Sequence, residues 1–171
     1  MGEEPRGTVM KVALLVVDMQ KAYDEGLSAL SMASAVEYID EVLNTFREKS
    51  APIIWIQDED EDDGVVQGSE GFELIDSLKP QDGEFFVVKH HGNAFHETNL
   101  SKILSHQGVD TVFITGFCAE FCVLSTYRGA QDAGFSPYLV KNACASGRDS
   151  NLRAVEQISE TVPYTLVPYL L

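Results

Sequence analysis

Residues 111–134, TVFITGFCAEFCVLSTYRGAQDAG, carry the pattern that decides the fold. The stretch opens with a short apolar, β-branched run that ends at Gly116. From Glu120 onward its apolar residues recur at helical spacing until a second glycine, Gly134. A strand, a tight turn and a helix are therefore predicted. Cys122 falls in the first turn of that helix, where unpaired backbone N–H groups favour an anion, so we expect its thiol to ionise more readily than a free thiol.

A lone cysteine is weak evidence of a nucleophile, because free cysteines are commonly buried as small hydrophobic residues. Partners for it are predicted at two other strand ends. Val12–Val17 is a continuous apolar run, typical of a strand buried on both faces of a parallel sheet, and Asp18 follows it. Glu84–Val88 is a further predicted strand, and Lys89 follows it. Because the carboxyl ends of parallel strands meet at one edge of a sheet, we expect Asp18, Lys89 and Cys122 to lie together.

Each partner also has a simpler interpretation. Aspartate after a strand can cap the following turn, and lysine is usually solvated at the surface. Together with the cysteine, however, the two residues make coherent chemistry. Cys122 would be a thiolate nucleophile, Asp18 the base that takes and returns its proton, and Lys89 the cation that lowers the pKa of both.

The rest of the chain alternates between helical and strand patterns. Helices are predicted over 31–49, 97–107 and 150–160, strands over 52–57, 135–140 and 161–167, and a short helix or irregular segment over 71–78. This alternation predicts a single α/β domain over residues 10–171. Its architecture would be three-layer α/β/α, with helices on both faces of a mostly parallel six-stranded sheet. Residues 1–9 are expected to form a flexible tail.

The composition excludes several classes of protein. The 171 residues include 12 basic and 27 acidic ones, and the formal net charge of −15 argues against nucleic acid and anionic membranes as partners. The N-terminal apolar stretch is too short for a membrane span and lacks the basic flank of a signal peptide, so we expect a cytoplasmic protein. The three cysteines show no C-x-x-C or zinc-finger spacing, which indicates neither a disulfide framework nor a structural metal site.

Acidic residues and histidines offer possible metal ligands. Asp58–Asp63 lacks the alternation and the distal glutamate of a calcium-binding loop, so we interpret it as a solvated, mobile loop and leave open whether it binds a cation. His96 and His106 flank a predicted helix and fit surface or capping groups, and one of His90 and His91 can face the site. We expect no metal ligand among the histidines.

Four stretches together resemble a known family, the isochorismatase-like cysteine hydrolases, which include nicotinamidases, carbamoylsarcosine amidase and ureidoacrylate hydrolases. They are LLVVDMQKAY (14–23), KHHGNAF (89–95), ITGFCAEFCVLSTYRGAQDAG (114–134) and NACAS (142–146), and the likeness covers nearly the whole chain. The resemblance implies that Asp18, Lys89 and Cys122 are the catalytic residues. It also implies a non-proline cis peptide before the nucleophile, between Cys118 and Ala119, that aims the N–H groups of Ala119 and Cys122 at an oxyanion.

The resemblance further implies hydrolysis of a small amide or ureido compound through a thioester, with no cofactor, in a homo-oligomer that is a dimer or larger. Nicotinamidases carry a metal-binding Asp-x-His pair after the second strand. Residues 57–60, Gln-Asp-Glu-Asp, lack that histidine and disfavour such an enzyme. True isochorismatases have a small residue at the nucleophile position, so Cys122 favours the thiol-dependent amidases.

Two further interpretations are compatible with the sequence. The chain could be a catalytically silent binding or scaffold module of the same family, or Cys118 and Cys122 could form a redox-sensing pair. Tyr23, Phe95 and Phe121 are candidate walls of the substrate pocket, with packing in the core as an equally good explanation for these aromatic residues.

Overall fold

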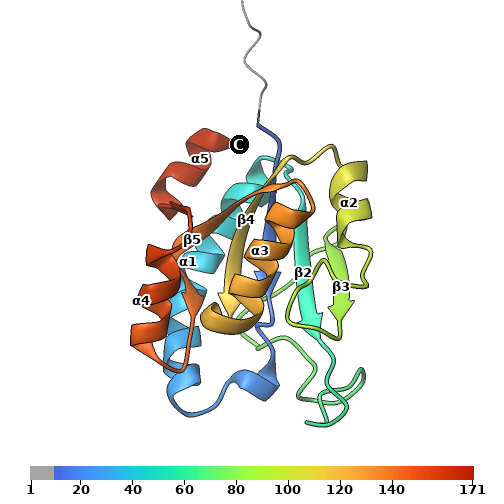
Figure 1. Ribbon diagram of the computed structural model, residues 1–171, viewed down its shortest axis with the longest axis vertical. Coiled ribbons are helices and arrows are strands. Elements are labelled where there is room, and N and C mark those ends of the chain that lie inside the picture. The colour runs from blue at the N-terminus through green and yellow to red at the C-terminus, as the bar shows by residue number, and fades with distance from the viewer. Residues whose placement is uncertain (1–9) are drawn as a thin grey trace, which may run out of the picture.

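Six strands form one sheet in the computed structural model, which describes residues 10–171 (Figure 1). The strand order is β3-β2-β1-β4-β5-β6, and every neighbouring pair is parallel. The strands are β1 Val12–Val17, β2 Ile53–Asp58, β3 Phe85–Lys89, β4 Thr111–Phe117, β5 Ser136–Ala145 and β6 Thr161–Val162. The predicted six-stranded sheet is confirmed. The tail predicted for residues 1–9 lies outside the described residues.

Helices cover both faces of the sheet, as predicted. They are α1 Gly26–Glu48, α2 Leu100–His106, α3 Leu124–Asp132, α4 Asp149–Gln157 and α5 Val167–Leu170. The side chains of β1 alternate between two cores: Leu14 and Val16 pack in the cluster that contains α1, whereas Leu15 and Val17 pack in the cluster that contains α2 and α3. The unbroken apolar run of β1 is thus explained by burial on both faces. Among the described residues, no helix has the length and apolar character needed to cross a membrane.

Two elements extend well beyond their predicted ends, over residues at which the buried apolar pattern is absent or interrupted. Helix α1 begins at Gly26 rather than Ser31, since its first apolar residues, Leu27 and Leu30, are 71% and 70% exposed and lie off the buried face from which the helix was predicted. Strand β5 continues past Val140 to Ala145, although the exposed Lys141 and Asn142 interrupt its apolar run. Its pairing with β4 shifts register at this point, which accommodates the interruption.

The last predicted strand, over residues 161–167, is wrong over most of its length. Strand β6 ends at Val162, and Pro163 follows it. Proline has no N–H with which to continue a ladder of hydrogen bonds. The chain instead forms a 3₁₀ turn over Tyr164–Leu166 and then α5.

The strand order reverses between β1 and β4, where the crossovers lead to opposite sides of the sheet. Open α/β sheets bind ligands at such a point, beyond the carboxyl ends of the strands. Asp18 follows β1 and Cys122 follows β4, so both lie at this position.

Candidate functional site

The three residues predicted to meet at the carboxyl edge of the sheet do so. Lys89 Nζ lies 2.9 Å from Asp18 Oδ2 and donates a hydrogen bond of 3.3 Å to Cys122 Sγ. The side chains of Lys89 and Asp18 are 0% and 1% exposed, so the solvated lysine of the simpler interpretation is not observed. A buried carboxylate and a thiol that contact the same cation supply a candidate base and a candidate nucleophile in one place.

Asp18 occupies a left-handed turn at the end of β1, with φ of +48°. Its backbone N–H still donates to Ile56 of β2, which fixes the residue to the sheet. Neither carboxylate oxygen accepts a well-aligned hydrogen bond from the described residues, so the 2.9 Å contact with Lys89 is a close ion pair rather than an aligned bond.

Asp58 belongs to this site, which the sequence analysis did not foresee. It ends β2 and pairs in register with Lys89, the last residue of β3. Its Oδ1 accepts a 2.7 Å hydrogen bond from Lys89 Nζ, and its Oδ2 accepts a 2.9 Å hydrogen bond from the hydroxyl of Tyr23. The interpretation of 58–63 as a solvated loop is thus wrong for Asp58. Its place directly after an apolar strand, shared with Asp18, was the signal that could have found it.

The surroundings shift the pKa of all three predicted catalytic groups. Burial raises the pKa of Asp18 to about 6, against the attraction of Lys89. Burial also raises the pKa of the Cys122 thiol, and the charge of Asp18 adds to this more than Lys89 opposes it. Burial alone would lower the pKa of Lys89, but its acidic neighbours raise it above the ordinary lysine value.

The expectation that Cys122 ionises more readily than a free thiol is therefore contradicted. Desolvation and the neighbouring carboxylate outweigh the favourable effect of the helix terminus. At neutral pH the site holds a thiol, a carboxylate and an ammonium group. A base would therefore have to remove the proton of Cys122 before its sulfur could act as a nucleophile.

Cys122, the candidate nucleophile, lies on a π-helical turn, Ala119–Val123, between β4 and α3, which we call the nucleophile turn. Among the described residues the only cis peptide bond joins Phe117 to Cys118, so its predicted position between Cys118 and Ala119 is wrong by one residue. The carbonyl oxygen of Cys118 accepts bonds from the N–H groups of Phe121 and Val123. The peptide that follows Cys118 is therefore part of the helical turn, and the change of direction occurs before it.

Gly116 brings this turn close to Asp18. A Cβ at Gly116 would lie 2.0 Å from the carbonyl oxygen of Val17, and the residue has φ of +112°. Only glycine fits such an approach without displacement of the backbone. The glycine thus sets the distance between the end of β1 and the start of the nucleophile turn.

Glu120 is a second residue that the sequence analysis missed. Its Oε2 accepts a 3.0 Å bond from Cys118 Sγ, and its Oε1 accepts bonds of 3.0 Å from Ser146 Oγ and 2.8 Å from Asn151 Nδ2. Burial alone would raise the pKa of Glu120, but these donors hold it below the ordinary value. Burial raises the pKa of Cys118 to about 12, so this thiol stays neutral. Glu120 thereby ties the nucleophile turn to the end of β5 and to α4.

The three candidate pocket residues have different surroundings. Tyr23 lies at the site, bonded to Asp58 and stacked on Phe117 with ring centroids 5.6 Å apart. Phe121 is next to Cys122 in the chain and is 66% exposed. Phe95 instead packs 5.7 Å from Phe135 in the core beneath α2 and α3, which favours core packing for this residue.

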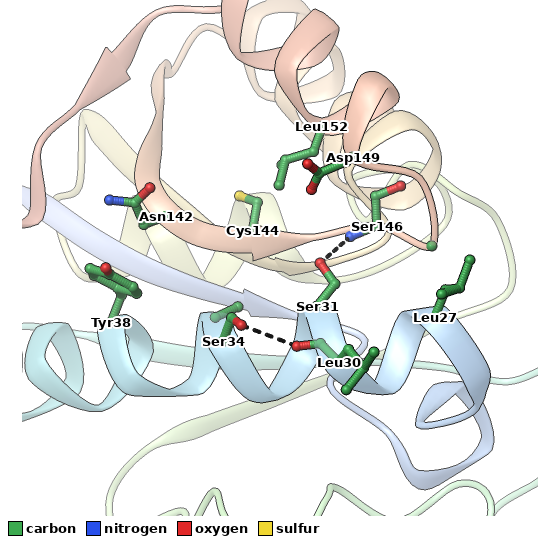
Figure 2. Close-up of a pocket in the computed structure, with 12 residues that line it drawn as sticks. Leu27, Leu30, Ser31, Ser34, Tyr38, Asn142, Cys144, Ser146, Asp149 and Leu152 are labelled. Atoms are coloured by element: carbon green, nitrogen blue, oxygen red, sulfur yellow. Dashed lines mark hydrogen bonds between the residues drawn. The ribbon is translucent and has the colours of Figure 1, made fainter.

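A pocket of about 520 Å³ lies beside the site, between the N-terminal half of α1 and the β5–α4 connection (Figure 2). Ser31 and Ser146 are neighbours in its wall: the backbone N–H of Ser146 donates to Ser31 Oγ at 3.0 Å, and the hydroxyl of Ser146 points away from Ser31. Its lining residues do not include Asp18, Lys89 or Cys122. Ser146 also donates to Glu120, so the pocket adjoins the residues that hold the nucleophile turn in place rather than Cys122 itself.

Comparison with known proteins gives a consistent result. Residues 12–162 match the family model of the Isochorismatase domain. The isochorismatase family protein YrdC of Bacillus subtilis is 34% identical over 146 residues, which are 82% of this chain and 78% of the relative. The maleamate amidohydrolase of Pseudomonas putida is 26% identical over 160 residues, with 82% and 75% covered. The crystal structure of N-carbamoylsarcosine amidase from Thermoplasma acidophilum superposes with a TM-score of 0.81 at 29% identity, covering 91% of this chain and 97% of that one.

Proposed function

The chain belongs to the isochorismatase family, and from this premise we propose that it is a cysteine hydrolase that cleaves a carbon–nitrogen bond of a small amide or ureido compound. Cys122 is the nucleophile, Asp18 the general base and acid, and Lys89 the cation that holds both. The observation that carries the proposal is the contact of one buried ammonium with both groups, 2.9 Å from the Asp18 carboxylate and 3.3 Å from the Cys122 sulfur.

In the first half of the reaction, Asp18 takes the proton of Cys122 as the sulfur attacks the carbonyl carbon. A carbon–sulfur bond forms, and the carbonyl π electrons move to oxygen. When the tetrahedral intermediate collapses, the carbon–nitrogen bond breaks and Asp18 gives its proton to the leaving nitrogen. Ammonia or an amine departs, and a thioester remains on Cys122.

In the second half, water attacks the thioester carbon and gives a proton to Asp18. The carbon–sulfur bond then breaks, and Asp18 returns the proton to the sulfur. The product is a carboxylic or carbamic acid, and all groups regain their starting states. A pKa of about 6 for Asp18 suits this double role, because the group is ionised at neutral pH and yet accepts a proton readily.

We assign the stabilisation of the oxyanion to the backbone N–H groups of Ala119 and Cys122. The N–H groups of Phe121 and Val123, in the same turn, already donate to the carbonyl oxygen of Cys118 at 3.0 and 3.1 Å. These two donors are therefore occupied; of the three that remain in the turn, those of Ala119, Glu120 and Cys122, the resemblance to the family selects Ala119 and Cys122.

The substrate class is supported by the relatives. One is a maleamate amidohydrolase, and the structural neighbour is an N-carbamoylsarcosine amidase, so an amide and a ureido substrate both occur among similar proteins. A nicotinamidase with a bound metal is disfavoured, because Asp58 directs one oxygen to Lys89 and the other to Tyr23. A redox-sensing pair is disfavoured as well, since Cys118 bonds to Glu120 while Cys122 bonds to Lys89.

The experiment that tests the proposal is a screen of small amides and ureido compounds for release of ammonia, followed by mass mapping of the cysteine peptides during turnover. We expect an acyl adduct on Cys122 and loss of all turnover in Cys122→Ala, with Cys144→Ala as the control because Cys144 is buried away from Lys89. Turnover that survives Cys122→Ala contradicts the mechanism. Ligand binding without turnover in the wild type would favour a silent binding or scaffold module.

A further inference from the structure

The loop between β3 and α2 gathers two imidazoles and a carboxylate outside the catalytic site. One ligand atom each of His91, His96 and Glu97 lies within 4.8 Å of the others. His91 Nε2 is 3.2 Å from Glu97 Oε2, and His96 Nε2 is 4.0 Å from Glu97 Oε1. The two imidazole rings have centroids 4.5 Å apart and are inclined by 68°. Three potential ligands therefore converge on one point of the surface.

We propose that His91, His96 and Glu97 form a binding site for a divalent transition-metal ion, for which Zn²⁺ has the best-matched preferences. Two imidazoles and one carboxylate are a donor set that zinc accepts, with a fourth position left for water. Ligands about 2.1 Å from a tetrahedral ion stand about 3.4 Å from one another. The separations of 3.2 and 4.0 Å, which join His91 and His96 to different oxygens of the Glu97 carboxylate, lie on either side of that value. Mg²⁺ and Ca²⁺ prefer oxygen ligands and do not suit it.

The loop that carries the three ligands is fixed to α3. The side chain of Asn93 sits where a Cβ at Gly129 would have to be, 2.0 Å from that position, so only glycine permits this contact. Asn93 also accepts bonds from the N–H groups of Phe95 and His96, at 2.9 and 3.0 Å. The N–H of Ala94 donates to Thr126 Oγ1 at 3.1 Å. A loop held in this way presents its side chains at fixed positions, which lowers the entropy lost on binding.

The backbone of Glu97 supplies an independent indication. This residue has φ of +54°, a left-handed conformation that glutamate rarely adopts. Its side chain is 73% exposed, so burial does not offset the cost of the conformation. What the conformation does provide is a carboxylate within reach of both imidazoles. Unfavourable backbone conformations that serve such an arrangement occur at binding sites.

By sequence, His96 fits a surface or capping group, and no metal ligand is expected among the histidines. That interpretation weighed each histidine alone. His91 and His96 are five positions apart in a segment without regular structure, and only the turn at Asn93 brings their rings together. The proposal is independent of the hydrolase activity, because none of the three ligands belongs to the proposed catalytic residues.

The test is equilibrium dialysis of the whole protein against Zn²⁺, with the visible spectrum of bound Co²⁺ as a second readout. We expect one ion per chain and a Co²⁺ spectrum without sulfur-to-metal charge transfer. His91→Asn, His96→Asn and Glu97→Gln should each weaken binding by at least about tenfold, the lower bound for loss of even an outer partner of a metal ligand. His106→Asn, an exposed histidine outside the cluster, should bind as the wild type does.

Thermal unfolding without metal serves as a check on the variants. The three side chains are exposed, so each variant should unfold at the wild-type temperature, and Zn²⁺ should raise that temperature only where the ligands are intact. Absence of saturable binding overturns the proposal. So does binding that survives all three substitutions, or a Co²⁺ spectrum dominated by thiolate, because the ion would then sit at the acidic loop or at a cysteine.

Discussion

Lys89 Nζ lies 2.7 Å from Asp58 Oδ1, closer than its 2.9 Å contact with Asp18. One buried ammonium group thus contacts two carboxylates, and its charge is shared between them. Burial is the main reason that the pKa of Asp18 is raised to about 6 despite the attraction of Lys89, and the charge of Asp58 adds a smaller rise. Asp58 consequently tunes the proposed base without touching the reacting atoms.

Replacement of Lys89 by Met should destabilise the protein by about 3–5 kcal/mol, the usual result when one partner of a buried ion pair is removed. Asp18 and Asp58 would be left without a cation. Urea unfolding at neutral pH measures this. The control is Lys21→Met, because Lys21 also contacts two carboxylates, Glu73 and Asp76, but at the solvated surface, where the loss should be far smaller. Equal losses in the two variants would contradict the buried network.

Asp58→Asn should lower the pKa of Asp18, because the charge of Asp58 raises it. Asp18 acts as a base in its ionised form, so activity rises with pH through its pKa of about 6. The acid limb of the kcat/KM profile should therefore move to lower pH in the variant. Tyr23→Phe removes the hydroxyl bonded to Asp58 without a change of charge and should leave that limb in place. A shift to higher pH would mean that Lys89 is displaced when Asp58 is neutral.

The stability of the fold should depend on pH through Asp18. Its pKa is raised from 3.8 to about 6 on folding, so its contribution is most favourable below the lower value and is lost as pH rises through the upper one. A shift of this size corresponds to about 3 kcal/mol. The difference in unfolding free energy between the wild type and Asp18→Asn should therefore fall by about that amount from about pH 3 to about pH 7, as measured by urea unfolding across this range. A constant difference would show that Asp18 is not shifted.

Glu120→Gln should slow catalysis by about 100-fold, the effect of a small misplacement of a reacting group. The Glu120 carboxylate now accepts hydrogen bonds from Cys118, Ser146 and Asn151. The NH₂ group of the glutamine amide would face at least one of these donors and could not accept its hydrogen bond. The loss should appear mainly in kcat, and the rate of Cys122 alkylation should change with it. Glu37→Gln, on the exposed face of α1, is the control. A wild-type rate of Cys122 alkylation in Glu120→Gln would show that Glu120 does not position Cys122.

Gly116→Ala should destabilise the protein far more than Gly134→Ala. Both glycines have positive φ, +112° and +88°, so both substitutions strain the backbone. Only the Cβ at Gly116 would meet another atom, the carbonyl oxygen of Val17 at 2.0 Å, whereas the one at Gly134 meets nothing within 4 Å. Gly134→Ala should cost about 1 kcal/mol and Gly116→Ala several times more, by thermal or urea unfolding. Similar losses would show that the close approach relaxes easily.

The sequence was sufficient to predict the sheet and three members of the candidate site. Continuous apolar runs identified the buried strands, and parallel strands all end at the same edge. Asp18 and Lys89, placed directly at those ends, therefore had to approach Cys122. The same reasoning applied to Asp58 would have found it, but the five acidic residues that follow it suggested a solvated loop.

Tertiary structure alone decided the properties that depend on surroundings. The pKa of Cys122 follows from its burial beside Asp18, which no local pattern reports. The role of Glu120 arises from contacts with β5 and α4, distant in the chain. Local periodicity records which side of an element is apolar, because burial selects for it. Other properties depend on distances between elements, which exist only once the chain has folded. They include which group holds a proton, which residues contact a carboxylate, and whether two histidines lie close together.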